Sequence, residues 1–301
     1  MNQKNTAASV RAKLLQKARD EKRDFTFVLT RYALERLLYR LGISRHAESS
    51  LLKGALLFDL WFDTPHRPTR DIDLLGFGPG EDTFLTAAFT ELCSLSIEDG
   101  VVFDPASVRA TEIRKTSNYA GTRLTLVGWL DGARCPVQVD IAFGDAITAP
   151  PETMEYPVLF SEFPPPRLKV YPKLTVIAEK LETMVALGIA NSRMKDFFDL
   201  WVLSEHGEYD GLELTRAIDA TFGRRRTPVP PGVPFALTDD FAADQQKQAQ
   251  WQAFLGKNRL AAVSLNDLVL DLRRFLMPPL TALAQGQAFP GNWSRASGWH
   301  E

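Results

Sequence analysis

Asp71 and Asp73 are the residues of this chain whose types and spacing most clearly indicate chemistry. They stand in the run Thr69-Arg70-Asp71-Ile72-Asp73-Leu74. Side chains alternate between the two faces of a β-strand, so aspartates separated by one residue point to the same side. Such a pair can hold one or two Mg²⁺ ions, which keep several waters and bind through carboxylates and substrate phosphates. The sequence therefore predicts metal-assisted nucleotide chemistry.

The alternative for this pair is a structural one, because Asp is common in turns and at helix N-caps. The apolar neighbours Ile72, Leu74 and Leu75 favour a half-buried strand instead. Uncompensated charge is costly in that location, and a metal ion would compensate both carboxylates.

Asp140 lies between Val139 and Ile141 in a second apolar run, VQVDIAFGD. A charge within such a strand needs a partner. If this strand neighbours that of Asp71, three carboxylates converge, and Asp140 completes the metal site or serves as a general base. The alternative is a structural aspartate paired with an arginine.

Lys180 falls on the apolar side of an expected helix, as a rotation of about 100° per residue shows. A lysine on a buried stripe usually extends along it to reach water. The functional alternative is a point charge that reaches a triphosphate across a domain interface. Asp196 and Asp199 are i, i+3 neighbours on the next expected helix, and could orient Lys180, Lys195 or a substrate. A structural role for Asp196 in the first helical turn is the alternative.

Lys53 and Gly54 precede the aspartate pair and add a weaker signal. Glycine allows the backbone to approach a phosphate closely, but the surrounding residues match no complete phosphate-binding motif. Basic residues are sparse over 109–123, dense over 224–226 and frequent in 7–24. We expect each of these stretches to be ordinary solvated surface rather than an RNA-binding patch.

The composition describes a globular protein with a hydrophobic core. The 301 residues are 45% hydrophobic and 24% charged, with a net charge of −2, so this is not a bulk polyelectrolyte binder. Two cysteines and four scattered histidines form neither a disulfide framework nor a zinc signature. The sequence shows no signal peptide and no membrane-spanning run, and we expect a cytoplasmic protein.

The pattern along the chain predicts helices followed by strands and then further helices. A proline-rich stretch at 148–172 is the best candidate for an interdomain segment. We expect a first domain at 1–165 and a helical C-terminal domain at 166–301, with little regular structure in the last fifteen residues. The expected helices are 7–24, 25–41, 82–97, 173–189, 193–205 and 239–285, and the expected strands are 71–75, 123–130 and 137–142, the last two joined by a hairpin turn at Asp131-Gly132.

Three segments together resemble the AbiEii/AbiGii-type nucleotidyltransferase toxins of type IV toxin–antitoxin and abortive-infection (phage defence) systems. The resemblance covers residues 25–205, and it rests on YALERLLYRLGIS…LLKGALLFDLW…RPTRDIDLL, on VQVDIAFGD and on YPKLTVIAEKLETMV…NSRMKDFFDLW. It implies an α+β fold, in which a polymerase beta-type nucleotidyltransferase domain, a mixed sheet with flanking helices, precedes a helical domain.

The resemblance also implies an activity and a set of residues. The activity is transfer of a nucleoside monophosphate from an NTP, with Mg²⁺ or Mn²⁺, plausibly to the 3′ end of tRNA, in a toxin with a cognate antitoxin. The alternatives are NMPylation or phosphoryl transfer to a protein, or a non-catalytic nucleotide- or RNA-binding regulator. By position, Asp71 and Asp73 match the metal-binding aspartates of the family, Asp140 the third carboxylate, Lys180 the nucleotide-contacting lysine and Asp199 the late aspartate, and we expect all five to be catalytic, with the three aspartates as metal ligands. Gly54 and Thr69 match the early glycine and the hydroxyl position before the first aspartate, and we expect both to bind the nucleotide. From their places in the sequence, without a match in the family, we add Lys53, Arg70, Lys195 and Asp196 as candidate nucleotide-binding residues. The chain departs from the superfamily at Gly54-Ala55, which replaces a Gly-Gly or Gly-Ser pair, and in the longer gap from Gly54 to Asp71.

Overall fold

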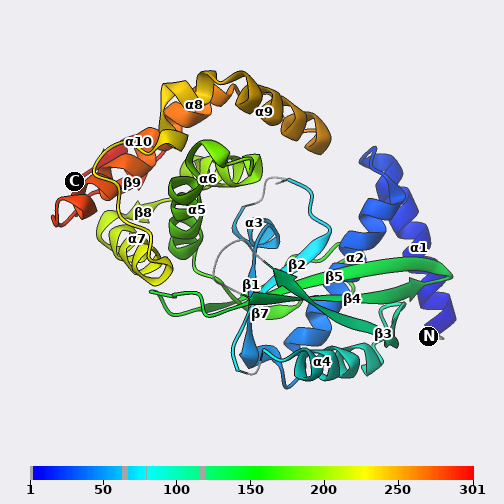
Figure 1. Ribbon diagram of the computed structural model, residues 1–301. Coiled ribbons are helices and arrows are strands. Elements are labelled where there is room, and N and C mark those ends of the chain that lie inside the picture. The colour runs from blue at the N-terminus through cyan, green and yellow to red at the C-terminus, as the bar shows by residue number, and fades with distance from the viewer. Residues whose placement is uncertain (1–2, 63–66, 79, 115–119) are drawn as a thin grey trace. The chain divides into compact units, whose positions relative to one another are not determined.

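A seven-stranded mixed sheet carries the aspartate pair (Figure 1). The computed structural model describes residues 3–62, 67–78, 80–114 and 120–301. The strand order is β3-β4-β5-β2-β1-β7-β6, in which β2 runs parallel to β5 and β1 runs parallel to β7. The strands are β1 (Ser50–Lys53), β2 (Asp71–Gly76), β3 (Val101–Arg114), β4 (Ala120–Leu130), β5 (Ala133–Phe143), β6 (Glu152–Glu155) and β7 (Arg167–Val170).

Helices α1 (Gln3–Asp20), α2 (Phe25–Gly42) and α4 (Asp82–Ser94) pack against this sheet, and α3 (Leu56–Trp61) follows β1. Helix α2 begins after Asp24, whose side chain accepts a hydrogen bond from the backbone N–H of Phe27, as an N-cap should. Ile72 of β2 and Val139 of β5 are buried in the core, so the alternation predicted for both strands is present.

The hairpin predicted at residues 131 and 132 joins β4 to β5. Asp131 and Gly132 both have positive φ, 46° and 76°, as a two-residue turn of this kind requires. The ten paired positions from Gly121↔Ala142 to Leu130↔Ala133 run without a shift. The turn therefore fixes which residues of the two strands face each other.

A second unit is mostly helical, as predicted. Helices α8, α9 and α10 divide the expected helix at 239–285 into three, and Arg259 ends α9 with a φ of 54°. The elements are α5 (Lys173–Leu187), α6 (Met194–His206), β8 (Tyr209–Asp210), α7 (Gly211–Arg225), α8 (Asp239–Ala243), α9 (Gln245–Asn258), α10 (Leu265–Ala284), β9 (Asn292–Ser294) and β10 (Gly298–His300). The mixed sheet with flanking helices and a helical C-terminal region confirms the predicted fold class.

The proline-rich stretch at 148–172 differs from the expectation of an extended linker. It contains β6 and β7, which pair with each other, and β7 also pairs with β1. The first compact unit consists of Met1–Gly144 and Pro151–Tyr171, and the second of Asp145–Pro150 and Pro172–Glu301. Because β7 hydrogen-bonds to β1, residues 166–171 belong to the first unit, whereas the boundary expected at 165/166 would assign them to the second.

The last fifteen residues also differ from the expectation, because they form an ordered hairpin of β9 and β10. Trp293 is buried, and its indole N–H donates to the carbonyl of Ser204 over 2.9 Å. The ring of Trp293 lies 4.7 Å from that of Phe275 in α10. In the described part of the chain, no helix combines the length and the apolar character needed to cross a membrane.

Candidate active site

Four charged residues stand in register across the centre of the sheet. Lys53 faces Asp73 across β1 and β2, Asp73 faces Asp140 across β2 and β5, and Asp140 faces Arg123 across β5 and β4. Residues directly opposite on neighbouring strands place their side chains on the same face. The sheet therefore arranges the charges in the order plus, minus, minus, plus, and the two predicted aspartate runs do lie on adjacent strands.

Asp71 lies on the same face, two residues before Asp73. Both aspartates are half-buried, whereas Ile72 between them is fully buried on the opposite face. The hydroxyl of Thr69 donates to Asp71 over 2.5 Å, which fixes that carboxylate from the loop before β2. Arg70 is exposed. The strand thus presents two neighbouring carboxylates, which is the donor set that a hard divalent cation requires.

Gly54 forms the turn between β1 and α3 with a φ of +72°. A Cβ at this position would overlap the carboxylate of Asp73. The sequence prediction placed Gly54 at this site for close approach to a phosphate. In the structure, the group that approaches its backbone is the carboxylate of Asp73.

Asp140 is paired with an arginine, which was the alternative to a metal role. Arg123 donates from Nε and Nη2 to the two carboxylate oxygens of Asp140, over 2.9 and 2.8 Å. These hydrogen bonds raise the pKa of the Arg123 guanidinium, and the charges of Asp71 and Asp73 act in the same direction. Arg123 therefore lies within electrostatic reach of all three carboxylates.

The fit of this face to a divalent ion can be tested on these contacts. Among the described residues, no three acidic, histidine or cysteine side chains are already grouped as a metal ion would need. Asp71 and Asp73 provide two oxygen donors on one face, whereas both oxygens of Asp140 accept hydrogen bonds from Arg123. The pair on β2 fits a divalent ion, and Asp140 as a ligand stays a prediction.

Lys53 is the positive charge on the other side of the aspartate pair. Its ammonium lies over the ring of Tyr171, 4.1 Å from the centroid, an arrangement that favours the cation. Tyr171 is fully buried and its backbone N–H donates to Leu52. The lysine is therefore positioned by the segment that follows β7.

In the second unit, Lys180 of α5 joins the two predicted aspartates of α6. Its ammonium donates to Asp196 and to Asp199, each over 2.8 Å. Both carboxylates are 1% exposed, whereas the lysine side chain is 16% exposed. Of the two lysines considered for these aspartates, Lys180 is the one they hold, and Lys195 is exposed.

Arg193 completes this group by donating to Asp196 over 2.5 Å. Burial alone would raise the pKa of the Asp196 carboxyl, but the charges of Lys180 and Arg193 outweigh it and hold this pKa below its usual value. Two cations and two carboxylates thus balance each other. The two hydrogen bonds to Asp196 and Asp199 fix the position of the Lys180 ammonium.

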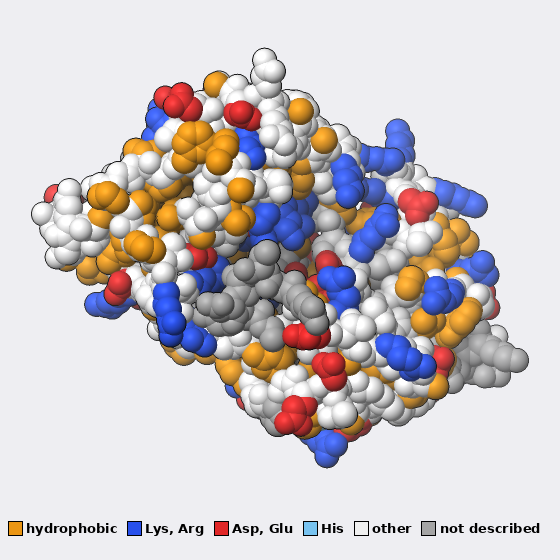
Figure 2. All heavy atoms as spheres, in the orientation of Figure 1, with side chains coloured by type: hydrophobic (Ala, Val, Ile, Leu, Met, Phe, Trp, Pro, Cys, Tyr) orange, Lys and Arg blue, Asp and Glu red, His pale blue; other side chains and the backbone are white. Residues whose placement is uncertain are grey.

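Several residues of the basic stretches pair with acidic residues of the chain. Arg225 of the run 224–226 donates to the buried Glu182 over 2.6 Å, so it joins α7 to α5. Lys13 is paired with Glu162 and Arg11 with Asp131. On the face shown in Figure 2, basic and acidic side chains both occur across the surface.

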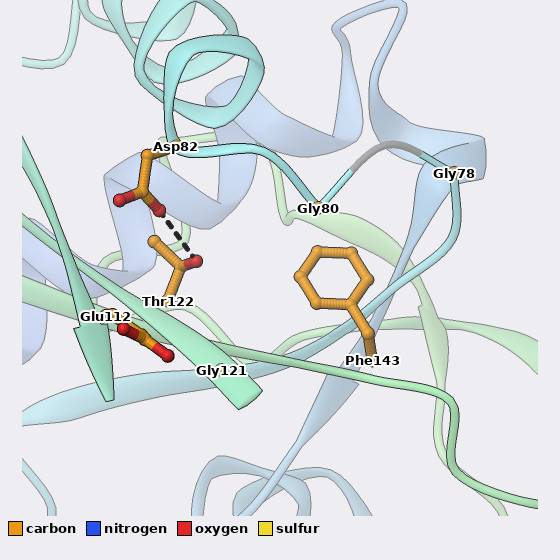
Figure 3. A pocket seen from close by; sticks show the side chains of 7 residues that line it. All are labelled: Gly78, Gly80, Asp82, Glu112, Gly121, Thr122 and Phe143. Carbon is orange, nitrogen blue, oxygen red and sulfur yellow. Dashed lines mark hydrogen bonds between the residues drawn. The ribbon is translucent and has the colours of Figure 1, made fainter. Parts of the chain in front are cut away.

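The first unit contains a pocket of about 450 Å³ (Figure 3). Asp82 and Glu112 are its charged lining residues, and Asp82 accepts a hydrogen bond from Thr122 over 3.0 Å. Neither Asp71, Asp73 nor Asp140 is part of its lining. Among the described lining residues there are two carboxylates and no cation, which disfavours a triphosphate, so we do not assign the nucleotide to this pocket.

Arg123 is the site residue that the sequence prediction missed, because it was treated as part of a sparse basic surface stretch. The turn at residues 131 and 132 held the signal. With Leu130 facing Ala133, counting back along both strands places position 123 opposite Asp140. The same count would have shown that the predicted carboxylate has an arginine beside it.

Comparison with known proteins agrees with the resemblance in the motifs. A model of the family described as Nucleotidyl transferase AbiEii toxin, Type IV TA system, matches residues 36–269. The match is well over half of the chain, and it extends beyond residue 205, where the recognisable motifs end. No curated protein matches the chain.

Two solved structures from Helicobacter pylori are similar at low identity. The crystal structure of JHP933 has 15% identity and a TM-score of 0.46, covering 83% of this chain and 86% of that one. A putative nucleotidyltransferase has 15% identity and a TM-score of 0.44, covering 83% of this chain and 89% of that one. These values alone establish neither family nor activity. The family match does establish both, and the chain belongs to the AbiEii family of nucleotidyl transferase toxins of type IV toxin–antitoxin systems.

Proposed function

We propose that this nucleotidyltransferase transfers a nucleoside monophosphate from an NTP to the 3′ end of tRNA, with Mg²⁺ or Mn²⁺ held by Asp71 and Asp73. The observation that carries the proposal is the placement of these two carboxylates on one face of β2, where Asp73 is in register with Lys53 and Asp140. A divalent ion held by these carboxylates would polarise the phosphoryl oxygens of the NTP in an in-line displacement.

The reaction forms one bond and breaks one. A hydroxyl of the acceptor attacks the α-phosphorus of the NTP, the bond from that phosphorus to the β-phosphate oxygen breaks, and pyrophosphate leaves. The hydroxyl proton passes to a base. Asp140 was predicted as that base. Both of its oxygens accept hydrogen bonds from Arg123, so neither oxygen is positioned for the proton by these contacts, and the role stays a prediction.

Lys180 is the proposed phosphate-binding cation of the second unit. Its two hydrogen bonds to Asp196 and Asp199 fix the ammonium, and its partial exposure leaves it accessible to a nucleotide. Asp199 acts as a positioning residue in this proposal, because it contacts the lysine and is itself buried. Lys53, Thr69, Arg70 and Lys195 are the remaining proposed nucleotide contacts.

Membership of a type IV toxin–antitoxin family implies an antitoxin partner and an NTP substrate. We propose that the antitoxin is encoded near the toxin. Two other reactions compete for the same site. One is NMPylation, in which the nucleoside monophosphate is transferred to a protein, and the other is transfer of the γ-phosphoryl group.

A labelling experiment separates these reactions. Purified protein, Mg²⁺ and total tRNA are incubated with each of four α-³²P-labelled NTPs and run on a denaturing gel, with γ-³²P-labelled NTPs in parallel. We expect α-label in the tRNA band for the wild type and for Glu152→Gln, a substitution at an exposed position of β6. We expect none for Asp71→Asn or Asp73→Asn, or when EDTA is present.

The other outcomes name the other reactions. Label from the α-phosphate in a protein band would replace tRNA by a protein acceptor. Label from the γ-phosphate would replace nucleotidyl transfer by phosphoryl transfer.

A further inference from the structure

We propose that Arg123 supplies the positive charge that neutralises Asp140, so that the chain itself holds one divalent ion, through Asp71 and Asp73, and not a second one at Asp140. The inference rests on the proposed function, because it concerns the metal site of that reaction. In this proposal Arg123 holds the carboxylate of Asp140 in place, and Asp140 is no longer a metal ligand.

The first argument is the geometry of the pair. Arg123 engages both oxygens of Asp140 through two parallel hydrogen bonds. This two-pronged pairing is the strongest contact between an arginine and a carboxylate, and a lysine cannot reproduce it. With its amide turned round, Gln138 also accepts from Nε and Nη2 of Arg123, over 3.3 and 3.2 Å. The guanidinium therefore has three acceptor oxygens on β5.

The second argument is the balance of charge on this face. The three carboxylates carry three negative charges, and Lys53 and Arg123 carry two positive ones on the same face. One divalent ion at Asp71 and Asp73 already exceeds the single negative charge that remains. A second divalent ion on Asp140 would share that carboxylate with a guanidinium, and the two cations would repel each other.

The third argument is the register of the sheet. Arg123 and Asp140 are paired residues of a hairpin whose pairing runs without a shift from the turn. Their separation is set by neighbouring strands and not by a loop. The arginine is thus built into the same rigid face as the two metal ligands.

The test is a titration of the full-length protein with Mn²⁺, in which free Mn²⁺ is measured by electron paramagnetic resonance. Arg123→Met combined with Asp140→Asn removes both members of the pair and leaves the net charge unchanged. We expect this double variant to bind one Mn²⁺ with the affinity of the wild type, within about threefold. Asp73→Asn should weaken binding by about tenfold or more, as loss of a ligand does.

One result would overturn the inference about Arg123, and a different result would overturn the metal site of the proposed function. If the double variant loses as much affinity as Asp73→Asn, Asp140 is a ligand and the inference about Arg123 fails while the metal site stands. If Asp73→Asn binds Mn²⁺ like the wild type, the metal site of the proposed function fails. Thermal unfolding checks that each variant is folded. If the variant with Arg123→Met and Asp140→Asn does not fold, the variant with Arg123→Gln and Asp140→Asn replaces it, because Gln and Asn can keep a hydrogen bond between the two positions.

Discussion

Gly54 lies directly against the carboxylate of Asp73, and any Cβ at residue 54 would overlap that carboxylate. The two residues come from neighbouring strands: Gly54 directly follows β1, and Asp73 lies within β2. The position of Asp73, a proposed metal ligand, therefore depends on the absence of a side chain at residue 54, in the turn after the neighbouring strand.

Gly54→Ala should therefore displace Asp73 and reduce nucleotidyl transfer by about 100-fold, the scale expected when a reacting group is misplaced by about 1 Å. The control is Gly132→Ala, which shares a positive φ (+76°) but has nothing within 4 Å of the added Cβ. Both variants bear the strain of a side chain in the left-handed region, about 1 kcal/mol. Equal activities, measured with labelled NTP, would show that the contact with Asp73 has no role.

Lys180→Met should destabilise the second unit by about 3 kcal/mol, because it leaves two buried carboxylates with one cation. Asp199→Asn should lower the free energy of unfolding by only about 1 kcal/mol, because Lys180 keeps its hydrogen bond to Asp196 and stays in partial contact with water. Urea denaturation followed by circular dichroism measures both. A larger loss for Asp199→Asn than for Lys180→Met would contradict this charge balance.

The same lysine should govern the response of this unit to acid. Lys180 and Arg193 hold the pKa of Asp196 below its usual value, so the carboxylate contributes stability at neutral pH that is lost as the pH falls through its folded-state pKa. Lys180→Met removes the larger of the two lowering charges. The free energy of unfolding of this variant should therefore fall less steeply on acidification than that of the wild type.

Glu35 gives the first unit a pH dependence of the opposite sign. Burial raises the pKa of this carboxyl from 4.5 to about 7, although one oxygen accepts the backbone N–H of Leu159 over 2.7 Å. Between pH 4.5 and about 7 the folded state holds a proton that the unfolded state has released, so the contribution of Glu35 to stability is greatest below pH 4.5 and declines as the pH rises to about 7.

Glu35→Gln should remove this decline. Relative to the wild type, the variant should gain up to about 3 kcal/mol in the free energy of unfolding between pH 4.5 and pH 8. Urea titrations at five pH values provide the measurement, with Glu152→Gln as the control for loss of one carboxylate. A constant difference between Glu35→Gln and wild type across this range would show that Glu35 does not take up the proton.

Trp293→Ala should destabilise the second unit by about 3–5 kcal/mol, the usual cost of removing a buried tryptophan side chain. The indole packs on Phe275 and donates to Ser204, so both packing and a hydrogen bond are lost. Leu270→Ala, at a position of α10 that is 41% exposed, should change stability by about 0.5 kcal/mol or less. Similar unfolding curves for the two variants would mean that the C-terminal hairpin adds nothing.

Local signals explain the parts of the fold that could be predicted. The alternation around Asp71 and Asp140, and the turn at Asp131-Gly132, are properties of neighbouring residues. They predicted β2, β4 and β5 and hence the possible meeting of the aspartates. Helices α2, α5 and α6 were predicted from apolar spacing, with ends within a few residues of those observed.

The missed parts depend on contacts that are distant in sequence. Strand β7 has four residues and gains its place by pairing Val170 with Leu52, a partner that no local pattern names. The C-terminal hairpin is held by Trp293 and Trp299 against Phe275. The contact of Lys180 with two buried carboxylates was predicted as one option, because the three residues lie on helices that are adjacent in sequence. The contact of Gly54 with Asp73 could not be predicted, because it depends on the register in which β1 pairs with β2.

The segment Asp145–Pro150 belongs to the second unit, although both of its flanks, Gly144 and Pro151, belong to the first. The polypeptide thus passes between the units three times before it continues into α5. A single cut by a protease, or a single truncation of the gene, cannot yield two complete units. Fragments expressed separately would each lack a piece of chain, so the AbiEii toxin activity of this protein should be studied on the uncut polypeptide.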